Sequence, residues 1–256
     1  MNLTRSRRRG HDRPVALSRE HRAEIDARRV GALRHVAPNS AVARRIATAP
    51  PSYLLAHTGS DIARQCELLA PSPAPGAVRV AVTPGRTPGT WHLDIGTRDR
   101  AGLLACFTGV LVGAAIDVVQ AVVATWADGG ALQALVVRGD TAPDPVVLQR
   151  GFAAALERPL TSFPTDGVEI GFDQTMSPVF TACEVTAPDH PGLLHAVATA
   201  LAATGTDIHA ASVATVDGVA RDRFDLTDRD GRKIDADRQR QIRDTLRVGV
   251  RNAPAR

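Results

Sequence analysis

The sequence contains little lysine and few aromatic residues, and both shortages bear on nucleic-acid binding. Lys233 is the single lysine among 31 basic residues, and the arginines are spread along the chain, so the net charge of +4 marks no basic face. One basic cluster occurs at residues 5–13, but no aromatic residue on which a base could stack lies within it. We therefore expect a disordered basic tail at 1–14 and no nucleic-acid partner.

The sequence also lacks a long apolar run. The most apolar stretch extends from Leu111 to Val123, where Asp117 and Gln120 interrupt it, and it falls short of the roughly 20 residues that cross a membrane. The charged amino end is not followed by the apolar segment of a secretory signal. These two features predict a cytoplasmic protein that does not engage a membrane.

Cysteine is scarce as well, with three residues in the chain. Cys66, Cys106 and Cys183 stand in apolar surroundings, and their spacing does not fit a zinc site. In a cytoplasmic protein such cysteines remain thiols and pack as small apolar side chains. We expect no metal and no other cofactor.

The most informative segment is Asp-His-Pro-Gly-Leu-Leu at residues 189–194, which joins a strand-like run to a long apolar run. Asp189 is expected to cap the helix that follows, because its carboxylate can accept a hydrogen bond from an N–H group of the first turn. Pro191 suits the first helical turn, and Gly192 leaves the backbone bare. Uncovered N–H groups at a helix start attract carboxylates and phosphates. The loop therefore predicts a site for a small anionic or zwitterionic ligand.

The same segment occurs twice in the chain. A shift of about 90 residues aligns Asp99 with Asp189 and Gly102 with Gly192 without a gap. The match continues into the following strand-like run, where Val-Ala-Thr occurs at both 123–125 and 213–215. Because a loop, a helix and a strand align together, we predict two copies of one supersecondary unit.

Strand and helix patterns follow the same order in both copies. In the first copy, strands are expected at 78–82, 91–95, 116–126, 131–137 and 168–172, and helices at 101–114 and 145–156. In the second copy, strands are expected at 179–185, 207–216 and 219–226, and helices at 191–203 and 235–246. This order predicts an α+β fold of two ferredoxin-like βαββαβ units. The second sheet is expected to end one strand early or to be completed from elsewhere.

A helical segment precedes the repeats. Its short helices are expected to begin at caps such as Ser18 and Asp61, and their thin apolar faces should pack on the repeats or on another protein. The expected organisation is a basic tail (1–14), a helical segment (15–70), a Pro-rich linker (71–77), a first unit (78–175), a second unit (178–250) and a tail (251–256).

These motifs resemble a known family. Two units with Asp-x-x-Gly-Leu-Leu loops, the second followed by Ala-Ser-Val-Ala-Thr and Asp-Leu-Thr-Asp, resemble the tandem ACT domains at the carboxyl end of bacterial, actinobacterial-type protein-PII uridylyltransferases. Pro-Ser-Tyr-Leu-Leu at 51–55 and Asp-Ile-Ala-Arg at 61–64 are similar to the segment before those domains. In that family the full-length enzyme adds uridylyl groups to the signalling protein PII, an HD hydrolase domain removes them, and the ACT pair senses glutamine.

The resemblance implies a non-catalytic, amino-acid-sensing regulatory protein of nitrogen metabolism. Its implied partners are a free amino acid, with glutamine favoured, a second copy of the chain, and a protein of nitrogen signalling. The implied ligand-binding residues are Asp189, His190, Pro191, Gly192, Leu193, Asp207 and Ile208 in the second unit and Asp99, Arg100, Gly102, Leu103 and Asp117 in the first. Asp207, which replaces the asparagine often found there, is expected to pair with an α-ammonium, and Arg100 marks a weaker or altered first site.

Two alternatives remain open, a docking module without a small ligand and a metal-dependent enzyme. The sequence shows no Gly-Ser opening with paired aspartates for nucleotidyl transfer, and its one HD dipeptide, at 11–12, stands alone in the basic tail. A metal or acid–base set would have to use Asp189, His190, His195, Asp207 and His209. The five-residue spacing of His190 and His195 does not place two imidazoles on one helix face, so we predict no catalytic and no metal site.

Overall fold

A computed structural model describes residues 19–165 and 167–253, so the expected basic tail and Ser18 lie outside the described residues. The chain begins with helices α1 (Arg19–Leu33), α2 (Ala41–Ala47), α3 (Pro51–Ala56) and α4 (Gly59–Leu68). The first half follows with β1 (Val78–Pro84), β2 (Thr90–Arg98), α5 (Leu103–Gly113), β3 (Asp117–Thr125), β4 (Gly130–Arg138), α6 (Pro145–Ala155) and β5 (Leu160–Ser162). The second half comprises β6 (Glu169–Asp173), β7 (Thr181–Pro188), α7 (Leu193–Ala203), β8 (Thr206–Val216), β9 (Val219–Asp228), α8 (Ala236–Val248) and β10 (Val250–Ala253). No helix of the described part combines the length and the apolar character that a membrane crossing demands.

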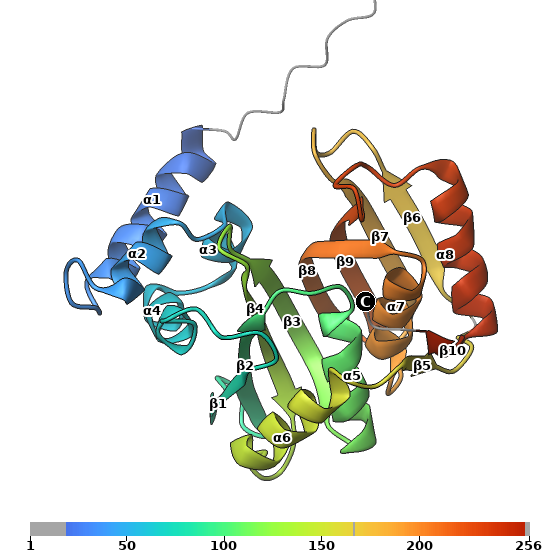
Figure 1. Ribbon diagram of the computed structural model, residues 1–256, viewed down its shortest axis with the longest axis horizontal. Coiled ribbons are helices and arrows are strands. Elements are labelled where there is room, and N and C mark those ends of the chain that lie inside the picture. The colour runs from blue at the N-terminus through green and yellow to red at the C-terminus, as the bar shows by residue number, and fades with distance from the viewer. Residues whose placement is uncertain (1–18, 166, 254–256) are drawn as a thin grey trace, which may run out of the picture.

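Strands of both halves form one antiparallel sheet of eight strands. Its order is β1-β2-β4-β3-β8-β9-β7-β6, so each half contributes four neighbouring strands. Helices α5 to α8 lie along one face of this sheet (Figure 1). The arrangement confirms the predicted α+β fold, with two ferredoxin-like units preceded by a helical segment.

The strand expected to close the first unit lies in the other half of the sheet. The sequence assigns residues 168–172 to the first unit, but β6 pairs with β7, from Glu169↔Thr186 to Asp173↔Ala182. The outer position of the first unit is taken by β1, which pairs with β2. Each half therefore starts with its outer strand, in the order ββαββα. Alternation identifies a strand but not its neighbour, and the short connection from β6 to β7 favours pairing of consecutive strands.

A pseudo-two-fold axis relates the two halves. At the centre of the sheet β3 pairs antiparallel with β8, and the middle residues of this pairing, Val122 and Ser212, are equivalent in the repeat. The equivalent helices α5 and α7 pack side by side (Figure 1). The short strands β5 and β10 also pair. β10 thus includes residues 251–253, which the sequence assigns to a tail, because a strand of four residues is too short to show alternation.

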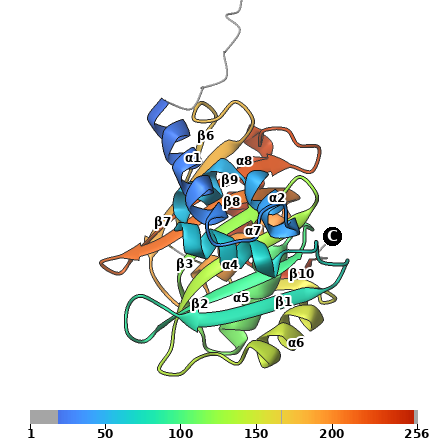
Figure 2. The ribbon, with the colours of Figure 1, turned by 90° about the vertical axis from the view of Figure 1, so that its left-hand side faces the viewer.

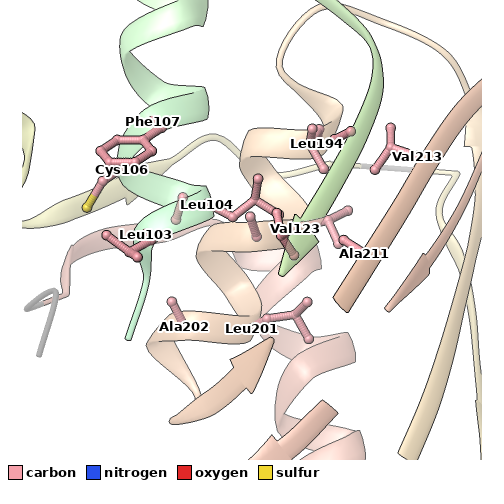
Figure 3. Packing of buried hydrophobic residues seen from close by; sticks show 14 of the residues in the cluster. Leu103, Leu104, Cys106, Phe107, Val123, Leu194, Leu201, Ala202, Ala211 and Val213 are labelled. Carbon is pink, nitrogen blue, oxygen red and sulfur yellow. The ribbon is translucent and has the colours of Figure 1, made fainter. Parts of the chain in front are cut away.

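The main core is shared by both halves. Leu104 and Leu194, at the starts of α5 and α7, lie among the strand residues Val123 and Val213 between helices and sheet (Figure 3). Each of these side chains is at most 8% exposed. Burying one such side chain contributes about 1.5–3 kcal/mol to the free energy of unfolding. The core therefore fixes the two halves against each other, and with them the loops that precede α5 and α7.

Helices α1 to α4 pack on the opposite face of the first half of the sheet (Figure 2). Tyr53 and Ile62 of these helices join Leu132 of β4 and Trp126, the residue after β3, in a second buried cluster. Trp126 Nε1 also donates a hydrogen bond to the carbonyl of Arg45, at 3.0 Å. The helical segment is therefore part of the fold, as its thin apolar faces predict.

The cap of α4 differs from the one expected. The sequence assigns it to Asp61, but the N-cap is Thr58, whose hydroxyl accepts a hydrogen bond from the Asp61 N–H at 3.3 Å. The same hydroxyl donates to Asp61 Oδ2 at 2.5 Å. Asp61 is thus the acidic third residue of a capping box, a role that sequence alone does not separate from the cap itself.

The three cysteines are buried and form no disulfide in the described part of the chain. Burial raises the pKa of the Cys66 and Cys183 thiols to about 12. Thiols with so high a pKa are poor nucleophiles and poor metal ligands. The cysteines therefore pack as small apolar residues, as predicted.

Candidate ligand pockets between the two halves

The two central helices begin at glycines rather than at aspartates. Gly102 is the N-cap of α5 and Gly192 is the N-cap of α7, with φ of 81° and 88°. The expected cap at Asp189 is therefore wrong. A positive φ is inexpensive for glycine alone, so the turn into the helix is made by glycine geometry instead of a side-chain cap.

Asp189 follows directly after β7 and is held by two hydrogen bonds to the β8–β9 hairpin. Its backbone N–H donates to the carbonyl of Gly218, at 2.9 Å, and its Oδ2 accepts a hydrogen bond from Thr215 Oγ1, also at 2.9 Å. Asp99 in the first half has corresponding partners in its own hairpin, namely the Gly129 carbonyl and the Thr125 hydroxyl. Each loop aspartate therefore fixes its loop to the hairpin of its own half.

The start of each helix presents backbone N–H groups. The first helical hydrogen bond of α7 runs from the Ala196 N–H to the Gly192 carbonyl, and that of α5 from Cys106 to Gly102, both at 2.9 Å. The N–H groups at 194–195 and 104–105 come before these bonds, at the positive end of the helix dipole. Such a helix start favours a carboxylate or another anion.

Each loop forms a pocket together with the other half of the chain. The first-loop pocket, about 370 Å³, is lined by residues 99–104 of the first half and 206–209 of the second. The second-loop pocket, about 170 Å³, is lined by residues 189–195 of the second half and 115–118 of the first. The two pockets are related by the pseudo-two-fold axis, and each one exists only because the halves pair.

From sequence, each loop is expected to form a site with the strand start of its own half. In the structure, each loop forms its pocket with the strand start of the other half. Asp207 and Ile208 line the first-loop pocket, not the pocket of the loop in their own half, and Asp117 lines the second-loop pocket. The reason is the antiparallel pairing of β3 and β8, which sets the start of β8 beside the end of β3, where Thr125 holds Asp99. Arg100, Gly102 and the other first-loop residues named from sequence therefore share a pocket with the second half.

Two carboxylates meet in the first-loop pocket. Burial raises the pKa of Asp99, and the negative charge of Asp207 raises it further. Burial also raises the pKa of Asp207, while His209 and Arg229 act in the opposite direction. A positively charged ligand group would relieve the repulsion between the two carboxylates.

A buried acid lies in the second-loop pocket. Asp222 of β9 is 3% exposed, and its Oδ1 has no hydrogen-bond partner among the described residues. Burial raises its pKa to about 7, although a hydrogen bond from the Ala214 backbone N–H to the carboxylate opposes the rise, and the charge of Asp189 adds to it. Sequence reasoning missed this residue, although Asp222 interrupts the buried positions Ala220, Phe224 and Leu226 on the inner face of β9. A polar residue that interrupts a row of buried apolar residues on one strand face is the sequence signal that could have identified Asp222.

The histidines of the metal hypothesis have separate partners. His195 lies between α5 and α7, with Nδ1 3.0 Å from the Ala105 carbonyl and Nε2 2.8 Å from the Thr161 carbonyl. His209 Nε2 lies 2.8 Å from Thr227 Oγ1, and His190 is exposed. Across residues 19–165 and 167–253, no group of three or more His, Cys, Asp or Glu side chains is arranged to hold a metal ion.

Comparison with known proteins finds a family match in the second half of the chain. Residues 181–244, from the start of β7 into α8, match the ACT domain. The first half has the same order of elements and pairs with the second around the pseudo-two-fold axis. The chain thus combines two units of the ferredoxin-like type, of which the second matches the ACT domain over residues 181–244.

The particular relatives are bifunctional uridylyltransferase/uridylyl-removing enzymes. The chain is 26% identical over 214 residues to the enzyme of Vibrio campbellii, covering 76% of this chain and 24% of the enzyme. It is 28% identical over 246 residues to that of Gluconobacter oxydans, covering 86% of this chain and 26% of the enzyme. The chain therefore spans about a quarter of the length of these curated relatives, and the predicted resemblance is confirmed. An aspartate kinase structure from Synechocystis is similar over 56% of this chain and 24% of that one, with 16% identity and a TM-score of 0.32.

Proposed function

We propose that this protein is a non-catalytic amino-acid sensor that binds a free amino acid in the pockets between its halves. The observation that carries the proposal is that each pocket joins a helix start of one half to an aspartate of the other. The N–H groups of the helix start suit the α-carboxylate, and Asp117 or Asp207 suits the α-ammonium. A zwitterion therefore bridges the two halves.

Bridging supplies a regulatory mechanism. A ligand that touches both halves stabilises the arrangement in which β3 pairs with β8 and α5 packs on α7. It thereby changes the free energy of that arrangement relative to a looser one, which is the requirement for a ligand-driven switch. The output would pass to a partner protein through the surface that this switch alters.

Glutamine is the proposed ligand and nitrogen metabolism the proposed setting, because the similar proteins are uridylyltransferase/uridylyl-removing enzymes. The chain matches about a quarter of those enzymes, and we do not assign their reaction to it. A protein partner of nitrogen signalling belongs to the same proposal.

A thermal-shift screen against the common amino acids tests the proposal. Glutamine at 100-fold above its Kd should stabilise the folded protein by about 2.7 kcal/mol, which raises its Tm. N-acetylglutamine, which lacks the α-ammonium, serves as the matched control and should have little effect. If no amino acid raises the Tm at millimolar concentration, the sensor proposal fails and a docking module without a small ligand becomes the better account.

A further inference from the structure

The strand behind each loop has one equivalent position in the two pockets, and a different polar residue occupies it in each. The ladder register places Gln133 of β4 opposite Val123. The flanking pairs Ser212↔Arg223 and Thr215↔Ala220 place Asp222 of β9 opposite position 213. Because positions 123 and 213 are equivalent in the repeat, Gln133 and Asp222 occupy the same place in the two pockets.

Both residues are buried and incompletely bonded. Each is 3% exposed, Gln133 lines the first-loop pocket and Asp222 lines the second-loop pocket. Gln133 Oε1 and Asp222 Oδ1 each have no hydrogen-bond partner within the described part of the chain. Buried oxygens without partners are rare and costly in folded proteins, so two of them at equivalent places call for a common cause.

Packing does not supply that cause. The inner face of β4 places Ala131 and Leu135 on either side of Gln133, and that of β9 places Ala220 and Phe224 on either side of Asp222, all buried. An apolar side chain at either position would continue the core without an unpaired oxygen. The polar groups therefore serve the cavity into which they open.

We propose that these two residues read the side chain of the bound amino acid and give the pockets different preferences. The inference rests on the proposed sensor function and deepens it. In its ionised form Asp222 only accepts hydrogen bonds, so in that form it selects a side chain with an N–H donor, such as an amide, and repels an acidic one. The amide of Gln133 both donates and accepts, so the first-loop pocket admits amide and acidic side chains alike.

The charges around Asp222 agree with this assignment. The other titratable groups that line the second-loop pocket are Asp117, Asp189, His190 and His195. Asp117 lies 3.3 Å from Arg138, and Asp189 accepts from Thr215. A side-chain N–H donor favours the ionised form of Asp222, whose pKa burial raises to about 7, so binding near neutral pH should release protons.

Calorimetric titration of the full chain with L-glutamine and L-glutamate, and with L-asparagine and L-aspartate as a shorter pair, tests the proposal. The preference is measured at about pH 8, where Asp222 is ionised, and the proton release at about pH 7, close to its pKa. In the wild type, one binding phase should favour the amide over the acid by at least about tenfold, with proton release seen as a dependence of heat on the buffer. Asp222→Asn should abolish both the preference and the proton release in that phase. The reciprocal change Gln133→Glu should create a preference for the amide in the other phase.

The outcomes separate this inference from the sensor function. If amino acids bind but Asp222→Asn leaves the preference and the proton release unchanged, the inference is overturned and the sensor function stands. If Asp222→Asn does not fold, Gln133→Glu decides, and an unchanged preference in that variant also overturns the inference. If neither pair binds the wild type, the inference falls, and the full amino-acid screen then decides the sensor function on its own.

Discussion

Replacing Asp222 by asparagine should change how the stability of the protein depends on pH. Burial raises the pKa of Asp222 from 3.8 to about 7, so the folded state holds this proton to a higher pH than the unfolded state does. Stability supplied by the protonated form is complete below about pH 4 and is lost as the pH rises through about 7. The rise of the Asp222 pKa from 3.8 to about 7 corresponds to about 4 kcal/mol of stability, and at 3% exposure little solvent reaches the carboxyl to screen its charge.

The assay is denaturant unfolding of wild type and Asp222→Asn at about pH 5 and pH 8. The wild type should lose about 2–3 kcal/mol more than the variant between the two pH values, because the loss takes place between pH 5 and about pH 7. The variant should be the more stable protein at pH 8. Gln133→Asn, a neutral change at the equivalent buried position, is the matched control and should keep the wild-type pH dependence. Equal pH dependence in wild type and Asp222→Asn would refute the reasoning, because the buried carboxyl, whose Oδ1 has no partner among the described residues, would then carry no such cost.

Three further predictions concern the loop, the reaction and assembly. Gly192→Val, at a φ of 88°, should cost about 1–3 kcal/mol of stability and weaken glutamine binding more than about tenfold, with unchanged affinity by calorimetry counting against the loop. The purified chain should neither add uridylyl groups to PII nor remove them with magnesium or manganese, and turnover above a heat-treated control would contradict this. Among the described residues, the outer strands β1 and β6 each leave one edge of the sheet unpaired, so light scattering at tens of micromolar should show a mass above one chain. A strictly monomeric mass would exclude association.

The repeat made the fold predictable from sequence. The match of Asp99 with Asp189 and of Gly102 with Gly192 identifies two equivalent helices, and alternation locates the strands on either side of them. Alternation carries no information on which half a strand joins, and so the pairing of β6 with β7 was not predictable. The prediction that Asp189 caps α7 failed because a hydrogen bond to Gly218 holds this residue directly after β7. This contact joins residues that are far apart in sequence.

The pockets were predictable in part for the same reason. Local sequence identifies the helix-start loops, but it cannot show that Asp207 lies across from the loop of the other half, since that follows from the pairing of β3 with β8. Asp222 and Gln133 were missed because single polar residues in strands are usually exposed. Their burial is visible only once the helices cover that face of the sheet.

The central claim is that a free amino acid binds between the two halves, and backbone NMR of the labelled protein titrated with L-glutamine tests it most directly. The account predicts saturable shift changes at residues 99–104 and 189–195 together with 115–118 and 206–209, so that each loop responds with the strand start of the opposite half. Shift changes confined to other surfaces, or none at millimolar glutamine and at millimolar concentrations of the other amino acids, would contradict it.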